Sequence, residues 1–328
     1  MFALNITGSE SVEMVERRNP RIVDDHEAIV RVTTTAIGPR DLARYAGNHL
    51  PDGTIPGAEF CGLVDEVGGE VSAVDLGDLV TAIGVFDSSD DRRALGWNGL
   101  DGGQALYVRV PNANNTLLKV PTAGIEERAL LLGDTYGLGA SAAATAMAYG
   151  DGPVCLIGCD PYGASALMAL RSAGVEHVIA VDSEERRRGL AMRLGAIPFD
   201  ASADDVYDIV VEETGGDGPT TVILGAGVSP EHVELGVRLV RDSGVVVLTE
   251  PALPGWPGPE PVNDRDITIV ATSPPSRVDV ARSMLDLWGG TLDLEMLVSH
   301  VMPINDAERG YAQLHAHERG AHKILLKM

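Results

Sequence analysis

The stretch "PVCLIGCDPYGASALMALRSAG", residues 153–174, decides the fold of this chain. Residues 153–157 are typical of a short buried strand, and Pro161 is expected to begin a helix that runs to about Ala173. Between them, residues 158–163 keep the frame of the G-x-G-x-x-G turn that binds a dinucleotide pyrophosphate. Asp160 replaces the second glycine, so a carboxylate stands where a phosphate would bind.

Other residues in and after this strand–turn–helix segment support a dinucleotide site. Gly158 and Gly163 can still make the bend and pack the helix against the strand. Asp182 ends the next strand, about 20 residues on, where an acid binds the ribose hydroxyls of NAD, and this favours NAD over NADP. The predicted cofactor-binding residues are Gly158, Asp160, Tyr162, Gly163, Asp182 and Gly225, the last in a glycine-bearing turn of the second half.

Asp160 leaves two interpretations open. A carboxylate about 4 Å from a phosphate costs about 1 kcal/mol in water-like surroundings and about 4 kcal/mol at an effective dielectric of 20, so NAD would bind roughly ten to a thousand times more weakly. Alternatively, Asp160 caps the helix that begins at Pro161, in a sheet that binds no nucleotide. Glu250, at the end of a later strand, adds a further acid and weighs against NAD.

The surrounding pattern defines the fold class as α/β. Apolar strands alternate with amphipathic helices from residue 153 to about 273, which predicts a doubly wound parallel sheet. Residues 28–80 predict short strands joined by turns, and residues 251–264, "PALPGWPGPEPVND", predict a loop at the carboxyl edge of the sheet. Residues 277–328 predict a helix, a strand, a helix and a strand.

Composition limits the partners. A chain of 328 residues is expected to form two domains, and no apolar run approaches the roughly 18 residues that span a bilayer. The N-terminus does not resemble a signal peptide, so we expect a cytoplasmic protein. The net charge of −23 disfavours nucleic acid and membranes as partners and leaves a small-molecule substrate. The three cysteines are expected to be small core residues.

Several segments together resemble the zinc-containing alcohol dehydrogenases, the medium-chain dehydrogenase/reductase family. Residues 57–80, "GAEFCGLVDEVGGEVSAVDLGDLV", are similar to that family's G-H-E-x-x-G-x-V signature, and residues 33–47 resemble its first zinc-cysteine segment. The resemblance implies a Rossmann domain over residues 136–276. It also implies a mostly-β, GroES-like catalytic domain over 1–135 and 277–328, and assembly as a homodimer or homotetramer.

The resemblance also shows where this chain departs from the family. It places the catalytic cysteine at Gly38, the signature histidine at Ala58, and an acidic or cysteine ligand at Asp134, with Glu59 following the missing histidine. Two carboxylates without sulfur or imidazole make a poor zinc site. The structural zinc lobe should lie in residues 86–104, which contain no cysteine. We therefore expect no bound zinc.

Arg40 stands where the family has its proton-relaying hydroxyl. We expect it to pair with Glu59 or Asp134, or to contact the substrate oxygen; a purely structural salt bridge is the alternative. Arginine is always charged and cannot donate a proton near neutrality, so Tyr45, Tyr136, His49 or water would be the donor. The two carboxylates could also receive a cationic substrate such as an amine or iminium.

These observations predict a zinc-independent, NAD(H)-dependent oxidoreductase. Its substrate would be a small polar or cationic biosynthetic intermediate, with hydride passing to or from a carbonyl, imine or activated alkene in the cleft between the domains. The predicted catalytic residues are Arg40, Tyr45, Glu59, Asp134 and Tyr136. The alternative is a non-redox enzyme or a metabolite-binding protein on the same scaffold.

Overall fold

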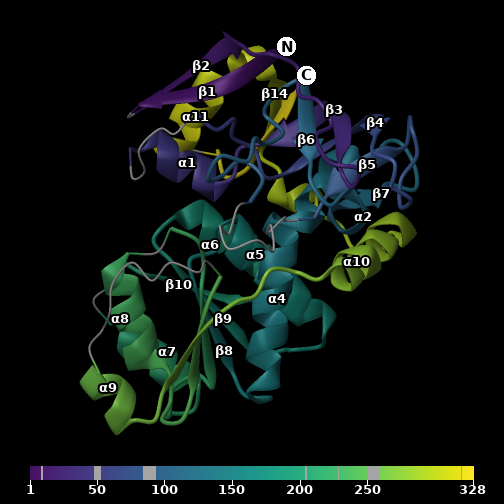
Figure 1. The fold of residues 1–328 in the computed structure, drawn as a ribbon. Helices are drawn as coiled ribbons and strands as arrows, with labels where there is room; N and C mark the ends of the chain where they lie inside the picture. Colours follow the sequence, from purple (N-terminus) through teal and green to yellow (C-terminus); the bar gives the residue numbers. More distant parts are fainter. Residues whose placement is uncertain are drawn as a thin grey trace. The chain divides into compact units, whose positions relative to one another are not determined.

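The computed structural model describes residues 1–8, 10–47, 53–83, 94–203, 205–227, 229–249, 259–318 and 320–328 (Figure 1). The chain divides into two compact units, one of Met1–Asp134 with Pro275–Met328 and the other of Thr135–Pro274. Within the described ranges, no helix has the length and apolar character needed to cross a bilayer.

The second unit is built on a parallel sheet, as the alternating pattern predicts. Its order is β10-β9-β8-β11-β12-β13, the 3-2-1-4-5-6 arrangement of a doubly wound dinucleotide-binding fold. The central strands are buried along their whole length because helices cover both faces, which is why they are nearly continuous runs of valine, isoleucine and leucine. The strands are β8 (Val154–Ile157), β9 (Val178–Asp182), β10 (Ile197–Asp200), β11 (Thr221–Leu224), β12 (Val245–Leu248) and β13 (Thr268–Ala271).

The helices after β8 follow the expected positions with one correction, whereas α4 precedes the predicted alternation. Residues 251–264 are predicted to form a loop, but Pro259–Asp264 form a short helix, α9. Proline is well tolerated in the first turn of a helix, so a proline-rich segment can still begin one. The other helices are α4 (Thr135–Ala148), α5 (Pro161–Ser172), α6 (Glu185–Arg193), α7 (Val206–Glu213) and α8 (Pro230–Leu239).

The first unit is mostly β. A mixed sheet has the order β14-β15-β3-β4-β5-β7, with β6 also paired to β3, while β1 and β2 form a separate hairpin (Figure 1). The strands are β1 (Phe2–Gly8), β2 (Ser11–Glu16), β3 (Ala28–Ala36), β4 (Phe60–Val67), β5 (Leu79–Ala82), β6 (Tyr107–Val110), β7 (Leu117–Lys119), β14 (His300–Pro303) and β15 (Ile324–Lys327).

Short helices connect and cover these strands. The longest described are α10 (Arg277–Gly289) and α11 (Ala307–His315), and α1 (Pro39–Tyr45) lies between β3 and β4. The remaining elements are α2 (Ala113–Thr116), α3 (Glu126–Ala129), and the 3-10 helices η1 (Leu130–Gly133), η2 (Glu295–Leu297) and η3 (Ile304–Asp306).

Two contacts bring distant segments of the first unit together. The C-terminal strand β15 pairs antiparallel with β3, and the amide of Ile37 donates to the carbonyl of Ile324 over 3.0 Å. The residue just before β15, Lys323, therefore lies next to the turn that leads from β3 into α1.

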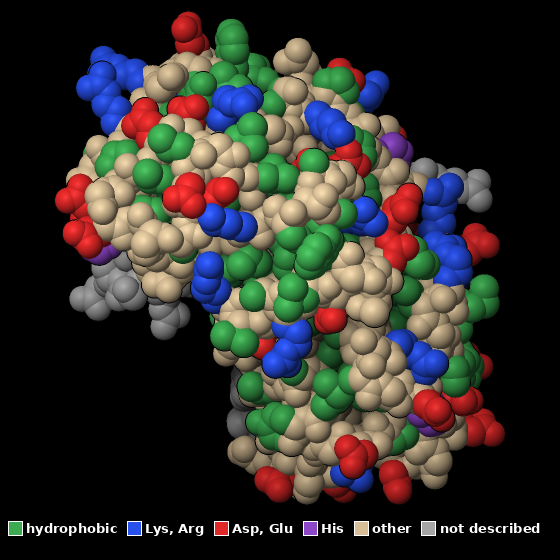
Figure 2. Space-filling model, turned by 90° about the vertical axis from the view of Figure 1, so that its right-hand side faces the viewer, with side chains coloured by type: hydrophobic (Ala, Val, Ile, Leu, Met, Phe, Trp, Pro, Cys, Tyr) green, Lys and Arg blue, Asp and Glu red, His purple; other side chains and the backbone are tan. Residues whose placement is uncertain are grey.

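On the face drawn in Figure 2, basic side chains are interspersed with acidic ones.

Candidate active site

The turn between β3 and α1 is held in place by a buried carboxylate. Asp41 accepts hydrogen bonds from the amides of Gly38 (3.0 Å) and Gly57 (3.1 Å) and from Nε2 of Gln104 (3.1 Å). Burial raises the pKa of Asp41, while the two backbone hydrogen bonds and the nearby charges of Arg44 and Arg40 oppose the rise. This network fixes residues 38–41 against residues 57–59, the two segments that carry Arg40 and Glu59.

Arg40 forms an ion pair with Asp134. Its Nη2 lies 2.8 Å from Oδ1 of Asp134, and the two side chains are 32% and 5% exposed. Arg40 comes from the first turn of α1, and Asp134 directly follows η1. Of the two carboxylates expected as partners, the structure therefore pairs Arg40 with Asp134.

Glu59 is paired with Lys323, a residue that the sequence reasoning missed. Nζ of Lys323 bonds Oε2 of Glu59, and both side chains are 1% exposed. The backbone oxygen of Glu59 accepts from Oγ1 of Thr35 and the amide of Ala36, which keeps Glu59 beside β3. One signal was available: lysine is rare in this arginine-rich chain, and Lys323 precedes a strand that was predicted correctly.

The predicted proton donors come from different parts of the chain. Tyr45 is buried in an apolar core, with ring centroids 5.2 Å from Tyr311 and 5.6 Å from His315. Burial, with the charges of Glu10 and Glu308, raises the pKa of Tyr45. Tyr136 is the second residue of α4 and belongs to the other unit. His49 lies outside the described residues.

The residues at the family's zinc positions do not fit a zinc ion. Gly38 and Ala58 offer no side-chain ligand atom, and the carboxylates of Glu59 and Asp134 each bind a cationic side chain. Among the residues that the structure describes, no three His, Cys, Asp or Glu side chains are grouped as a metal site would require. Part of the expected structural lobe, residues 86–93, lies outside the described ranges, and Glu250 does as well.

In the second unit, Asp160 caps helix α5. Its Oδ1 accepts from the amide of Tyr162 (2.7 Å) and, at 3.4 Å, from that of Gly163, and the residue is 5% exposed. Gly225 makes room for this carboxylate, because a Cβ at position 225 would lie 2.2 Å from Oδ2 of Asp160. Asp160 therefore has the capping geometry, and this geometry is compatible with weakened nucleotide binding as well as with its loss.

The rest of the turn keeps the geometry of a dinucleotide site. Gly158 has a positive φ of 87°, and a Cβ on Gly163 would lie 2.0 Å from the Gly158 carbonyl oxygen, so neither position tolerates a side chain. Asp182 ends β9 and accepts from the amides of Cys159 (2.7 Å) and Glu184 (2.8 Å).

The residues of this turn therefore fit one part of a dinucleotide better than another. Asp182 stands where a ribose-binding acid belongs. The phosphate end is different, because Pro161 has no N–H and the amides of Tyr162 and Gly163 already donate to Asp160. The side chain of Tyr162 is fully buried, so the backbone of Tyr162, and not its side chain, faces the turn. The residues present fit the ribose better than the phosphates.

The comparisons with known proteins follow the same division into two units. Residues 24–122 match the alcohol dehydrogenase GroES-like domain family, and residues 161–272 match the zinc-binding dehydrogenase family. A zinc-type alcohol dehydrogenase B from Aspergillus flavus is 33% identical over 332 residues, which cover 93% of this chain and 76% of the relative. The chain belongs to the medium-chain dehydrogenase/reductase family.

Further relatives of this medium-chain dehydrogenase agree. A probable zinc-binding alcohol dehydrogenase from Mycobacterium tuberculosis is 30% identical over 336 residues, covering 96% of this chain and 86% of the relative. The structure of an alcohol dehydrogenase from Thermus sp. ATN1 superimposes with a TM-score of 0.88 at 28% identity, covering 100% of this chain and 99% of that chain. The predicted family and fold class are confirmed, and the family is one of oxidoreductases.

Proposed function

We propose that this medium-chain dehydrogenase is a nicotinamide-dependent oxidoreductase that works without zinc on a small polar substrate. Two ion pairs carry the proposal, Arg40–Asp134 and Lys323–Glu59. Each contains one of the two carboxylates that the resemblance places at the zinc site. Family membership and the retained acid Asp182 support a nicotinamide cofactor, which when bound would supply or accept hydride.

Arg40 is the group we assign to the substrate oxygen. Its guanidinium is held by Asp134 and its side chain is about one third exposed. Arg40 would donate a hydrogen bond to a carbonyl oxygen and stabilise the negative charge that develops there. It would thereby supply the polarisation that a metal ion supplies elsewhere. Arginine does not release its proton near neutrality, so the proton would come from another group or from water.

The ion pairs also narrow the substrate class. A cationic substrate such as an iminium would be attracted by carboxylates without a counter-charge. In this structure Glu59 and Asp134 are each paired with a cationic side chain. The two carboxylates therefore attract a cationic substrate less strongly than unpaired carboxylates would. The geometry supports a neutral or anionic carbonyl compound, or an activated alkene conjugated to a carbonyl, whose oxygen Arg40 can bind.

A non-redox function is the second candidate, and Asp160 is the observation that favours it. The carboxylate already satisfies the amides that a pyrophosphate would use, and it adds a negative charge at that place. A chain that had lost the cofactor could still use Arg40 to stabilise an enolate-like charge in an isomerisation or elimination.

The decisive experiment is a titration of the purified chain with NADH, followed by cofactor fluorescence. Saturable binding below millimolar concentration supports the redox function, and no binding at millimolar NADH supports the second candidate. Where NADH binds, its oxidation is measured with a panel of small aldehydes, ketones and enones. We expect Arg40→Ala to remain folded but to lose some stability, because Asp134 keeps a buried charge without its cation. It should lose at least tenfold in kcat/KM, with Arg40→Lys intermediate. Unchanged kcat/KM in Arg40→Ala would remove Arg40 from the site.

A further inference from the structure

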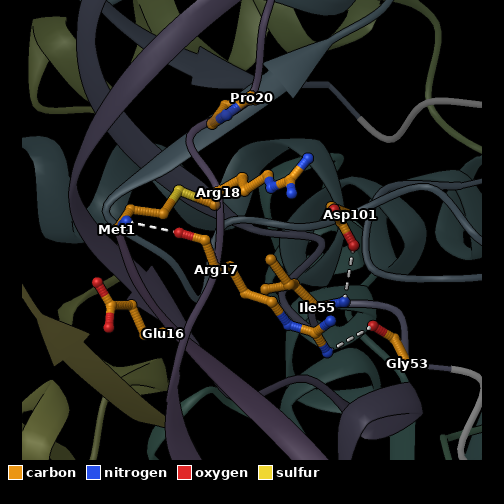
Figure 3. Close-up of a pocket in the computed structure, with 8 residues that line it drawn as sticks. All are labelled: Met1, Glu16, Arg17, Arg18, Pro20, Gly53, Ile55 and Asp101. Atoms are coloured by element: carbon orange, nitrogen blue, oxygen red, sulfur yellow. Dashed lines mark hydrogen bonds between the residues drawn. The ribbon is translucent and has the colours of Figure 1, made fainter.

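The first unit carries a pocket that the proposed function does not use. It has a volume of about 440 Å³ and opens beside the end of β2 (Figure 3). Its lining residues are Met1, Glu16, Arg17, Arg18, Pro20, Gly53, Ile55 and Asp101.

Two guanidinium groups are present in this pocket. Nη2 of Arg17 donates to the carbonyl of Gly53 (3.3 Å) and to Oδ1 of Asn5 (3.4 Å), which sets the position of its side chain. Arg18 is exposed, and it makes no hydrogen bond or ion pair with any residue that the structure describes. Glu16 also lines the pocket, and Figure 3 shows its side chain extending to the side opposite the Arg17 guanidinium.

Of the two carboxylates that line the pocket, Asp101 lies on the same side as the two guanidinium groups (Figure 3). Oδ1 of Asp101 accepts from the amide of Ile55 over 2.9 Å, which fixes the carboxylate at the edge of the pocket (Figure 3). Its other oxygen is oriented by that bond and can accept from a ligand. Ile55 is buried and Pro20 is half-buried, so they give the pocket an apolar wall.

We propose that this pocket binds a small hydroxycarboxylate. The planar guanidinium fork matches the two oxygens of a carboxylate, and charge-assisted bonds of this kind are among the strongest that proteins make. A hydroxyl on the same ligand donates to Asp101, which would otherwise repel an anion. The overall charge of −23 does not prevent this, because charges beyond roughly 8 Å are screened at physiological salt.

The test is calorimetric titration of the full chain with malate and with succinate, two dicarboxylates that differ by one hydroxyl. We expect malate to bind about fivefold more tightly than succinate, because the hydroxyl gains one hydrogen bond to Asp101. Asp101→Asn keeps an acceptor for the Ile55 amide but removes the charge, and should reduce the preference for malate.

Arg18→Ala should weaken malate binding at least tenfold. Arg21→Ala is the matched control, since Arg21 is exposed three residues further on, does not line the pocket and removes the same charge. It should leave the affinity within about twofold. The proposal is overturned if neither ligand binds, if succinate binds as well as malate, or if the two arginine variants weaken binding equally.

Discussion

Two regions of this protein depart from the family pattern, the zinc positions of the first unit and the phosphate-binding turn of the second. The acidic side chains in these two regions are stabilised in different ways. In the first unit, Glu59 and Asp134 are each paired with a cationic side chain from a distant segment of the chain, Lys323 and Arg40. In the second unit, Asp160 is stabilised by backbone amides of the helix that it begins. The first arrangement needs matched residues from separate strands and helices, whereas the second is local and rests on one side chain. The altered zinc position should therefore be costly to reverse, and the altered phosphate turn cheap.

The largest effect is expected for Lys323→Met. It leaves Glu59 as a buried charge without its cation, and such changes destabilise a protein by about 3–5 kcal/mol. Urea unfolding followed by circular dichroism measures the change. Lys327→Met is the control, because Lys327 pairs with Glu127 at the surface and should contribute less than about 1 kcal/mol.

A double variant sharpens this test. Replacing both Glu59 and Lys323 by methionine removes both charges, and it should recover most of the stability lost in the single variant. If Lys323→Met is no more destabilising than Lys327→Met, the pair is not the buried interaction that the structure describes.

The second effect concerns the phosphate turn. Asp160→Gly should raise the affinity for NADH by roughly ten- to a thousandfold, because it removes a negative charge and releases the amides of Tyr162 and Gly163. The loss of the cap should cost only a few tenths of a kcal/mol, since glycine is an acceptable N-cap. Fluorescence titration and urea unfolding measure the two quantities.

Asp160→Asn separates charge from capping. Asparagine caps a helix as well as aspartate does but is neutral, so an intermediate NADH affinity is expected. If neither variant binds NADH better than the wild type, the carboxylate is not what limits cofactor binding.

Asp41→Asn tests the hydrogen-bond network that holds residues 38–41 against residues 57–59. Whichever way its amide is oriented, the NH₂ group faces a donor that the carboxylate now accepts, so we expect a loss of about 1–3 kcal/mol at neutral pH. Because the pKa of Asp41 is raised above 3.8 in the folded state, the wild type gains stability as the pH falls from that raised value toward 3.8. Asparagine does not titrate, so the deficit of the variant should widen toward about pH 4. A deficit that narrows on acidification would contradict the raised pKa.

The smallest effect is expected for Tyr45→Phe. The ring is packed in the core against Tyr311, and phenylalanine keeps that packing. Activity should change by less than about twofold and stability by less than about 1 kcal/mol. A tenfold loss of kcat with unchanged folding would instead identify Tyr45 as the proton donor.

Much of the fold could be predicted from the sequence because its signals are local. Apolar runs such as Val154–Ile157 and the Asp160–Pro161 cap are read from neighbouring residues, and the strands and helix occur where expected. The pairing of Glu59 with Lys323 could not be predicted in this way, since it joins residues 264 apart through the register of β15 on β3. The same holds for Gln104 and Tyr311, which complete the network around Asp41 from separate elements.

We propose that this chain's own cations, Arg40 and Lys323, occupy the position of the family's metal. Elemental analysis of the protein, expressed in zinc-supplemented medium and purified without chelator, measures its zinc content. We expect zinc far below one equivalent per chain, with the same value in Glu59→Gln. One equivalent of zinc in the wild type, lost in Glu59→Gln or Asp134→Asn, would contradict it.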